Sequence, residues 1–242
     1  MKIACWSGPR NISTALMRSW SSRNDTYISD EPLYACYLKE NKINHPMYEE
    51  IISSYETNYL KIIETLQGQI PNQYKIWYQK HMAHHLQELE SLEWIESFHN
   101  CFLIRDPKYV INSYIKKNKL ESMKELGYYQ QYKILEYLKN KRGNFIVIDT
   151  QKFLNKPDLY LMQWCKKLNI RYKKNMLKWE KKIYPYDGIW AKHWYDNVVN
   201  SNTFFNKKNN PQEIPNKYYK IYEESKFYYD KIKKYELSLD YE

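Results

Sequence analysis

Short apolar runs alternate with longer amphipathic segments along this chain. The apolar runs have the length of buried strands and lie at residues 2–6, 26–29, 74–78, 101–104 and 144–148. Between them, apolar residues recur at helical spacing in the segments 13–22, 47–66, 82–98, 108–117, 122–139 and 158–168. This alternation predicts an α/β fold with a mostly parallel central sheet that is covered by helices on both faces.

No stretch with the composition of a linker divides the 242 residues, so we expect a single domain over residues 1–242. The segment from 187 to about 205 has neither helical nor strand periodicity and is rich in aromatic rings. Residues 206–242 are expected to form a closing helical region with a helix over 217–235.

The amino-acid composition bears on whether the protein binds nucleic acid or membranes and on its cellular compartment. The chain carries 38 Lys and Arg against 28 Asp and Glu, which gives a formal net charge of +10. The excess is spread along the whole chain and forms no basic tail, so we expect no nucleic-acid partner. The four cysteines are far apart and form no C-x-x-C pair, which indicates core thiols in a reducing compartment. No run approaches the roughly 18 apolar residues of a membrane span, so we expect a soluble cytoplasmic protein without a membrane partner.

The first candidate for chemistry is the turn that follows the first apolar run. A helix start leaves backbone N–H groups without partners and carries a partial positive charge, so it favours an anion. Arg10, Ser13 and Thr14 add side-chain donors at the same point. The ATP-type pattern G-x-x-x-x-G-K-[ST] is absent, and Ile12 stands where a late glycine would be. The alternative is an ordinary turn with Ser13 as the helix N-cap.

A second anion-binding candidate follows the fourth apolar run. Arg105 ends that run, Pro107 suits the first turn of a helix, and Ser113 lies about two turns further on. Arg105 and Ser113 would then hold one phosphate between a strand end and a helix. The alternative is a salt bridge between Arg105 and a nearby acid such as Asp106.

The two segments together resemble the P-loop sulfotransferases that use 3′-phosphoadenosine 5′-phosphosulfate (PAPS). Residues 9–14 align with the family's P-K-S-G-T-T loop, and Arg105, Pro107 and Ser113 have the spacing of its 3′-phosphate motif. Over residues 1 to about 205 the chain is most similar to bacterial sulfotransferase-like proteins. The shared motifs are S-G-P-R-N-I-S-T-A-L-M, D-E-P-L-Y, K-H-M-x-H-H, L-I-R-D-P and D-G-x-W-A-x-H-W-Y, here at 7–17, 30–34, 80–85, 103–107 and 187–195.

This resemblance implies a P-loop NTPase-like three-layer fold with a five-stranded sheet. It places PAPS, the sulfuryl donor, against Gly8, Pro9, Arg10, Asn11, Ile12, Ser13, Thr14, Arg105 and Ser113, with Lys181 or Lys182 as weaker candidates. Arg10 takes the place of the lysine that touches the bridging oxygen and supports charge on the leaving phosphate. The segment 187–205 is expected to be a lid over the sulfuryl donor and the acceptor.

An acceptor hydroxyl also needs a base, and two residues compete for this role. Glu31 resembles the acidic base of carbohydrate sulfotransferases, whereas His81 lies near the position of the histidine in aryl and steroid sulfotransferases. His84 and His85 are close neighbours of His81. No carboxylate or cysteine accompanies these histidines at a metal-binding spacing, so we expect no metal.

The sequence therefore predicts a sulfotransferase that moves a sulfuryl group from PAPS to a hydroxyl or amine of a small-molecule or carbohydrate acceptor. Arg10 and Ile12 depart from the family pattern, which leaves two alternatives open. One is a kinase-like P-loop phosphotransferase, and the other is a non-catalytic nucleotide-binding protein. The acceptor's identity and the oligomeric state cannot be read from these residues.

Overall fold

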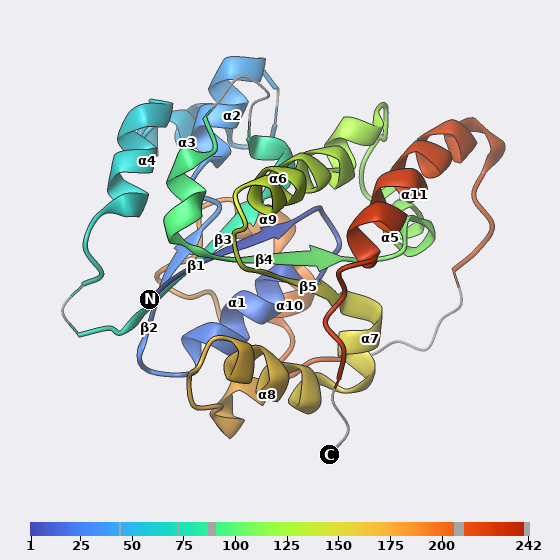
Figure 1. Cartoon of the computed structure of the whole chain (residues 1–242). Helices are drawn as coiled ribbons and strands as arrows, with labels where there is room; N and C mark the ends of the chain where they lie inside the picture. Colours follow the sequence, from blue (N-terminus) through green and yellow to red (C-terminus); the bar gives the residue numbers. More distant parts are fainter. Residues whose placement is uncertain (44, 72, 87–90, 206–210, 240–242) are drawn as a thin grey trace.

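The computed structural model describes residues 1–43, 45–71, 73–86, 91–205 and 211–239. Its centre is a five-stranded parallel sheet with the strand order β2-β3-β1-β4-β5 (Figure 1). The strands are β1 (Lys2–Ser7), β2 (Thr26–Asp30), β3 (Ile76–Met82), β4 (His99–Ile104) and β5 (Phe145–Asp149). The expected α/β fold with a parallel five-stranded sheet between helices is confirmed.

Helices cover both faces of the sheet. The face that lies lower in Figure 1 is covered by α1 (Ser13–Ser21), α7 (Thr150–Asn155) and α8 (Pro157–Lys167). The opposite face is covered by α4 (Tyr59–Gln67), α5 (Pro107–Tyr114), α6 (Tyr128–Asn140) and α11 (Tyr219–Lys233). The remaining helices are α2 (Tyr34–Asn41), α3 (Tyr48–Ser54), α9 (Ala191–Trp194) and α10 (Asp196–Val199).

The central strand β1 shows why both faces need cover. Ile3 and Cys5 point into the core cluster beneath α1 and α8, whereas Ala4 and Trp6 point into the cluster beneath α5 and α6. All four side chains are fully buried. A strand buried on both faces is apolar at nearly every position, which is the pattern that the sequence shows there.

The parallel arrangement brings the carboxyl ends of all five strands to one edge of the sheet. β1 lies between β3 and β4, and the chain crosses from one side of β1 to the other between them. Open α/β sheets bind ligands beside such a switch point, at the carboxyl ends of the strands. The segments after β1, β2, β3 and β4 are therefore the segments that can form a site.

Several predicted elements differ in extent. β3 runs to Met82 rather than ending at residue 78, and the helix predicted over 82–98 is wrong. In its place the described residues form the short 3₁₀ turns Ala83–His85 and Glu93–Ser97, and residues 87–90 lie outside the described part. The single helix predicted over 47–66 is the pair α3 and α4, and α2 and α7 were not predicted.

Two global features bear on the expectations from composition. Within the described part of the chain, none of the helices combines the length and apolar character that crossing a bilayer requires. None of the four cysteines forms a disulfide in the described part of the chain, and each is buried.

Candidate active site

A cleft of about 1290 Å³ opens at the carboxyl edge of the sheet. Its walls come from the turn after β1, the ends of β2 and β3, helix α5, and parts of the segment between residues 194 and 205. The sequence-predicted site residues that line it are Pro9, Arg10, Asn11, Ile12, Ser13, Thr14, Glu31, Arg105, Ser113 and Lys181.

The turn after β1 has the backbone shape of an anion cradle. Arg10 and Ile12 have positive φ angles of 62° and 53°, and Asn11 between them does not. Such an alternation turns successive N–H groups toward one concave point. The N–H groups of residues 10–14 donate no hydrogen bond to another group in the described part of the chain. They are free for a ligand at the start of α1.

Ile12 adopts this shape at a cost. A left-handed conformation costs a side chain with a Cβ roughly 1–2 kcal/mol, and a β-branched residue is rarely found there. Ile12 nevertheless has a φ angle of 53°, so isoleucine in place of the family's glycine does not prevent the loop from taking this shape. The loop is held in a strained conformation, as functional loops often are.

Two unpartnered donors, Nδ2 of Asn11 and Nε of Arg105, lie beside this turn. Both side-chain polar atoms of Asn11 and the Nε of Arg105 are buried without a hydrogen-bond partner. A buried donor usually has a partner, so the two donors fit the cationic character of the turn, whereas the unpartnered Oδ1 of Asn11 is an acceptor and does not favour an anion.

Arg105 joins the two predicted anion-binding segments. Its Nη1 donates to the backbone carbonyl of Arg10 at 3.2 Å, and its Nη2 donates to Oε1 of Gln151 at 3.0 Å. Its guanidinium also lies over the ring of Tyr109, 5.2 Å from the ring centre. Burial lowers the pKa of Arg105, although this group remains a cation at any physiological pH. Ser113 on α5 and Lys181 line the same cleft.

Two residues expected to bind the sulfuryl donor do not line this cleft. The N–H of Gly8 is taken by the side-chain oxygen of Gln131 at 3.2 Å, with the amide oriented so that its nitrogen donates to the carbonyl of Leu103. Gly8 is instead required for close packing, because a Cβ there would lie 2.1 Å from the carbonyl oxygen of Leu126. Lys182 is exposed and pairs with Glu180 at 2.5 Å.

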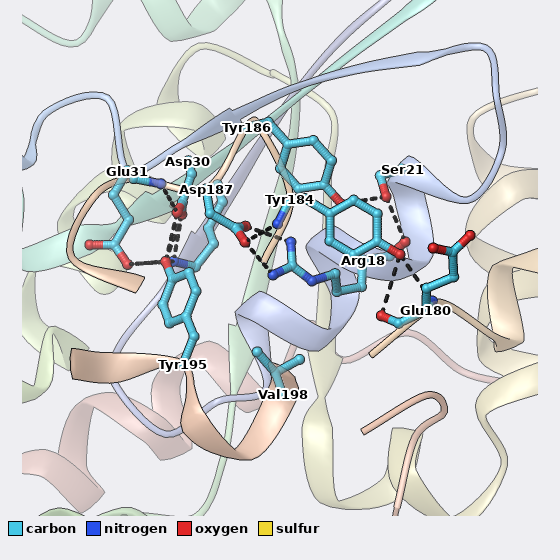
Figure 2. A network of polar contacts seen from close by, with 12 residues as sticks. Arg18, Ser21, Asp30, Glu31, Glu180, Tyr184, Tyr186, Asp187, Tyr195 and Val198 are labelled. Carbon is cyan, nitrogen blue, oxygen red and sulfur yellow. Dashed lines mark hydrogen bonds and ion pairs between the residues drawn. The ribbon is translucent and has the colours of Figure 1, made fainter. Parts of the chain in front are cut away.

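Glu31 stands at the end of β2 in a network of buried charges. Lys80 on β3 donates to Asp30 at 2.9 Å, to Glu31, and to the hydroxyl of Tyr195 at 2.7 Å. The ring of Tyr195 lies beside the two carboxylates with its hydroxyl directed toward them (Figure 2). This hydroxyl is 2.8 Å from both oxygens of Asp30 and 3.3 Å from Oε1 of Glu31. The backbone N–H of Gly188 completes the network at Oδ2 of Asp30.

Burial and the neighbouring charges shift the pKa values of Glu31 and Lys80. Burial raises the pKa of Glu31 above its ordinary value, and the repulsion of Asp30 adds to this, while Lys80 opposes it. Burial disfavours the Lys80 ammonium, but Asp30 and Glu31 outweigh this and raise its pKa. A carboxylate with a raised pKa that faces a cleft has the character of a general base.

His81 is not brought into the cleft. Its ring is 1% exposed, stacks on Trp6 with 4.5 Å between ring centres, and contacts Oε1 of Gln79 at 3.2 Å. Burial lowers the pKa of His81 to about 3, so the ring is neutral. It lies on the opposite face of β3 from Lys80 because side chains alternate along a strand. We therefore leave His81 out of the candidate site.

His84 and His85 line the cleft in its place. The ring of His85 is stacked between those of Tyr34 and Tyr37, with centres 4.9 and 4.7 Å away, and its Nδ1 lies 4.0 Å from Oε2 of Glu31. Burial lowers the pKa of His84 to about 3 and that of His85 well below its ordinary value. Both rings are neutral walls beside Glu31.

The segment 187–205, expected to be a lid, is attached to helix α1 through its first residue. Asp187 forms two hydrogen bonds, at 2.5 and 2.6 Å, with the fully buried guanidinium of Arg18 on α1 (Figure 2). Trp190 and Tyr195 are buried, and Trp194 and Tyr195 line the cleft. The segment forms a wall of the site with short helices α9 and α10 rather than an irregular loop.

Sequence reasoning missed the roles of Asp30, Lys80, Tyr195 and Arg18, although the motifs that contain or adjoin them had been noted. A lysine inside a run of buried positions is a signal, because Lys is almost never fully buried unless it is paired. Within the described residues, no group of three or more His, Cys, Asp and Glu side chains is arranged to hold a metal ion.

Comparison with known proteins defines the class. The family described as "Sulfotransferase domain" matches residues 1–230, and the chain belongs to this family. Membership supports transfer of a sulfuryl group as its general activity. A solved structure, the sulfotransferase domain from the Synechococcus PCC 7002 olefin synthase, superposes with a TM-score of 0.55 over 93% of this chain and 94% of that one. At 14% identity this similarity shows the fold alone, which is the expected P-loop NTPase-like fold.

Two curated relatives are similar in sequence. The "Branched-chain-amino-acid aminotransferase-like protein 1" of Arabidopsis thaliana is 34% identical over 226 residues, and protein 2 of the same name and organism is 32% identical over 225. Each alignment covers 92% of this chain. The chain spans only 40% and 39% of the lengths of these relatives.

Proposed function

We propose that this protein transfers a sulfuryl group from PAPS to a hydroxyl or amine of a small-molecule or carbohydrate acceptor. One observation supports this most directly: Arg105 contacts the carbonyl of Arg10, and both residues line one cleft with Ser113. The two anion-binding segments are thus close enough for a single doubly phosphorylated nucleotide. A cradle for one phosphate alone would not need the second segment.

Two groups of residues would bind the two ends of the sulfuryl donor. The free N–H groups of residues 10–14, with the hydroxyls of Ser13 and Thr14, would hold the 5′-phosphosulfate. Arg105 and Ser113 would hold the ribose 3′-phosphate, with Lys181 at the margin of the same cleft.

In the transfer step, PAPS supplies a sulfuryl group on a phosphate that leaves readily. Glu31 accepts the proton of the acceptor while the acceptor oxygen or nitrogen bonds to sulfur and the bond from sulfur to the bridging oxygen breaks. Arg10 stabilises the negative charge that remains on the departing phosphate. Lys80 pairs with Glu31, and the neutral ring of His85 lies beside it.

We also propose that residues 1–242 act as one domain in the cytoplasm, with neither a nucleic acid nor a membrane as partner. One sheet extends from residue 2 to residue 149, and α11 packs on β4, β5 and α6. Four free buried thiols fit a reducing compartment.

Calorimetric titration with adenosine 3′,5′-bisphosphate tests the binding site. We expect saturable binding by the wild type and roughly 10- to 100-fold weaker binding by Arg105→Ala, since a hydrogen bond to a charged group contributes about 1.5–3 kcal/mol. Arg142→Ala removes an exposed arginine elsewhere and should bind like the wild type. Absence of binding by the wild type, or equal loss in both variants, would refute the assignment of the sulfuryl donor.

A further inference from the structure

The charges around Glu31 do not balance by themselves. The side chains of Asp30 and Lys80 are each 1% exposed and that of Glu31 is 11% exposed. One ammonium therefore faces two carboxylates in a place that water barely reaches. Buried charge without compensation is costly, so the excess negative charge requires further donors.

The hydroxyl of Tyr195 supplies such a donor. The other groups around its oxygen determine where its hydrogen points. Lys80 donates to its oxygen at 2.7 Å, and the indole Nε1 of Trp190 donates to it at 3.3 Å. A phenol carries one hydrogen, and with both of these donors on the oxygen that hydrogen points to the two carboxylates, with Asp30 at 2.8 Å and Glu31 further away at 3.3 Å. It therefore acts on Glu31 both directly and by dispersing the charge of Asp30 that repels it. A hydrogen bond from a neutral hydroxyl to a carboxylate favours its ionised form.

We propose that Tyr195 is a positioning residue for the base: with Lys80 it holds the Glu31 carboxylate ionised and facing the cleft, and it joins this base to the wall formed by residues 187–195. This inference rests on the proposed function only in naming Glu31 as the base. Tyr195 does not need to touch the acceptor to act in this way, because it acts through Glu31.

The other groups around Glu31 cannot replace Tyr195. The titratable and charged side chains that face Glu31 come from β2, β3, α2, the turn after β3 and the 187–195 wall, and they are Asp30, Lys80, Tyr34, His85 and Tyr195. Asp30 repels a second negative charge. His85 is neutral because burial lowers its pKa, and no hydrogen bond joins Tyr34 to Glu31 among the described residues. Among these described neighbours, Lys80 and Tyr195 are the two that favour the ionised carboxylate.

Tyr195→Phe removes the hydroxyl alone and tests this role. The pKa of Glu31 should rise by up to about one unit, because a full hydrogen bond to a charged group is typically equivalent to one or two units and this one is shared with Asp30. The acid limb of the kcat/KM profile should then move to higher pH by the same amount. The same shift should appear without any substrate, in an NMR titration of isotope-labelled glutamate carboxyls in which Glu31→Gln identifies the signal.

Tyr186→Phe is the matched control. Tyr186 belongs to the adjoining stretch of chain and its hydroxyl bonds Oγ of Ser21 at 2.6 Å, away from Glu31 (Figure 2). This variant should leave the midpoint of the titration unchanged. An equal shift in both variants, or loss of kcat at every pH in Tyr195→Phe with an unchanged midpoint, would overturn the proposal.

A second substitution keeps the proposal testable if Tyr195→Phe does not fold. Placing 3-fluorotyrosine at position 195 preserves the volume and makes the hydroxyl a stronger donor, so the midpoint should move to lower pH; no movement would contradict the proposal. The NMR titration also separates two failures. A shifted Glu31 signal in an enzyme that transfers no sulfuryl group supports the positioning role and refutes the proposed function.

Discussion

Glu31 reaches the cleft through a backbone conformation that costs free energy. Its φ angle is 45°, which is unfavourable for a residue with a side chain, and its N–H donates to the carbonyl of Lys80 at 2.9 Å. This hydrogen bond closes the last pair of the β2–β3 ladder, Asp30 with Lys80, at the point where the chain turns. Strain of this kind persists where the surrounding contacts hold it, and it is frequent at active sites.

Separate substitutions of Glu31 and His81 show which of the two residues is the base. Glu31→Gln keeps the shape but cannot take a proton, so we expect kcat to fall by about 10²- to 10⁴-fold. His81→Gln should retain most of the turnover at pH 7.5, because His81 is buried against Trp6 away from the cleft. Release of adenosine 3′,5′-bisphosphate with an acceptor that the wild type uses measures both. A larger loss in His81→Gln would reverse the assignment.

Gly8 offers a second test at the scale of one residue. Gly8→Ala places a methyl group 2.1 Å from the backbone oxygen of Leu126, and backbone on both sides must move. We expect the free energy of unfolding to fall by roughly 1–3 kcal/mol, the usual cost of overpacking. Gly143→Ala meets its neighbours at 3.3 Å and should cost less. Urea unfolding compares the two, and equal costs would contradict the close approach.

At the scale of elements, the wall formed by residues 187–195 is tied to both halves of the site. Asp187 holds Arg18 on α1, the helix whose first turn forms the anion cradle. The guanidinium of Arg18 also lies 4.4 Å from the ring centre of Tyr184. Tyr195, at the other end of the wall, holds Asp30 and Glu31. Movement of this wall therefore requires that buried charged contacts break.

Asp187→Ala tests how strongly the wall is held. It leaves the fully buried guanidinium of Arg18 without its partner, and breaking a buried pair in this way typically costs about 3–5 kcal/mol. Asp230→Ala removes an ion pair of the same 2.5 Å length, with Lys226 on the surface of α11, and should cost less than about 1 kcal/mol. Denaturant unfolding measures both. Similar costs would show that the wall is not anchored by this contact.

The elements also show what a sequence can predict. The strand, turn and helix formed by residues 2–21 were predicted because buried apolar positions and turn residues are local signals. The second half of β3 was not, because Gln79, Lys80 and His81 read as the end of an apolar run. Their burial depends on partners far away in the chain: Lys80 contacts Asp30 and Tyr195, 50 and 115 positions distant. No local pattern contains such a pairing.

At the scale of the whole molecule, motifs separated along the chain meet at one edge of one sheet. Residues 30–34, 80–85 and 187–195 each contribute to the charge network, while residues 7–17 and 103–107 contribute the two segments that we propose bind the anion. The resemblance indicated these motifs, and the parallel sheet explains why they converge. The structure separates them into the turn beside Arg105, which we propose binds the anion, and the charge network around Glu31, which we propose as the base.

The histidines of this edge make the stability of the whole protein depend on pH. The pKa values of His81 and His84 are lowered to about 3 by burial, and that of His85 is lowered well below its ordinary value. The unfolded chain, with histidine pKa values near 6.5, takes up these protons first as the pH falls. The stability contributed by the neutral rings is therefore complete above about pH 6.5 and declines from there toward pH 3.

Each such histidine lowers the free energy of unfolding by up to about 1.4 kcal/mol for every pH unit of acidification. The three together lower it by up to roughly 4 kcal/mol per pH unit. Glu31, whose raised pKa acts in the opposite direction, is one group against three. Urea midpoints at pH 7.5 and 5.5 should therefore differ strongly in the wild type and less in His81→Gln, which lacks one titrating ring. His193→Gln alters an exposed ring and should keep the wild-type difference. An unchanged difference in His81→Gln would mean that its ring is accessible to protons in the folded protein, contrary to its burial against Trp6.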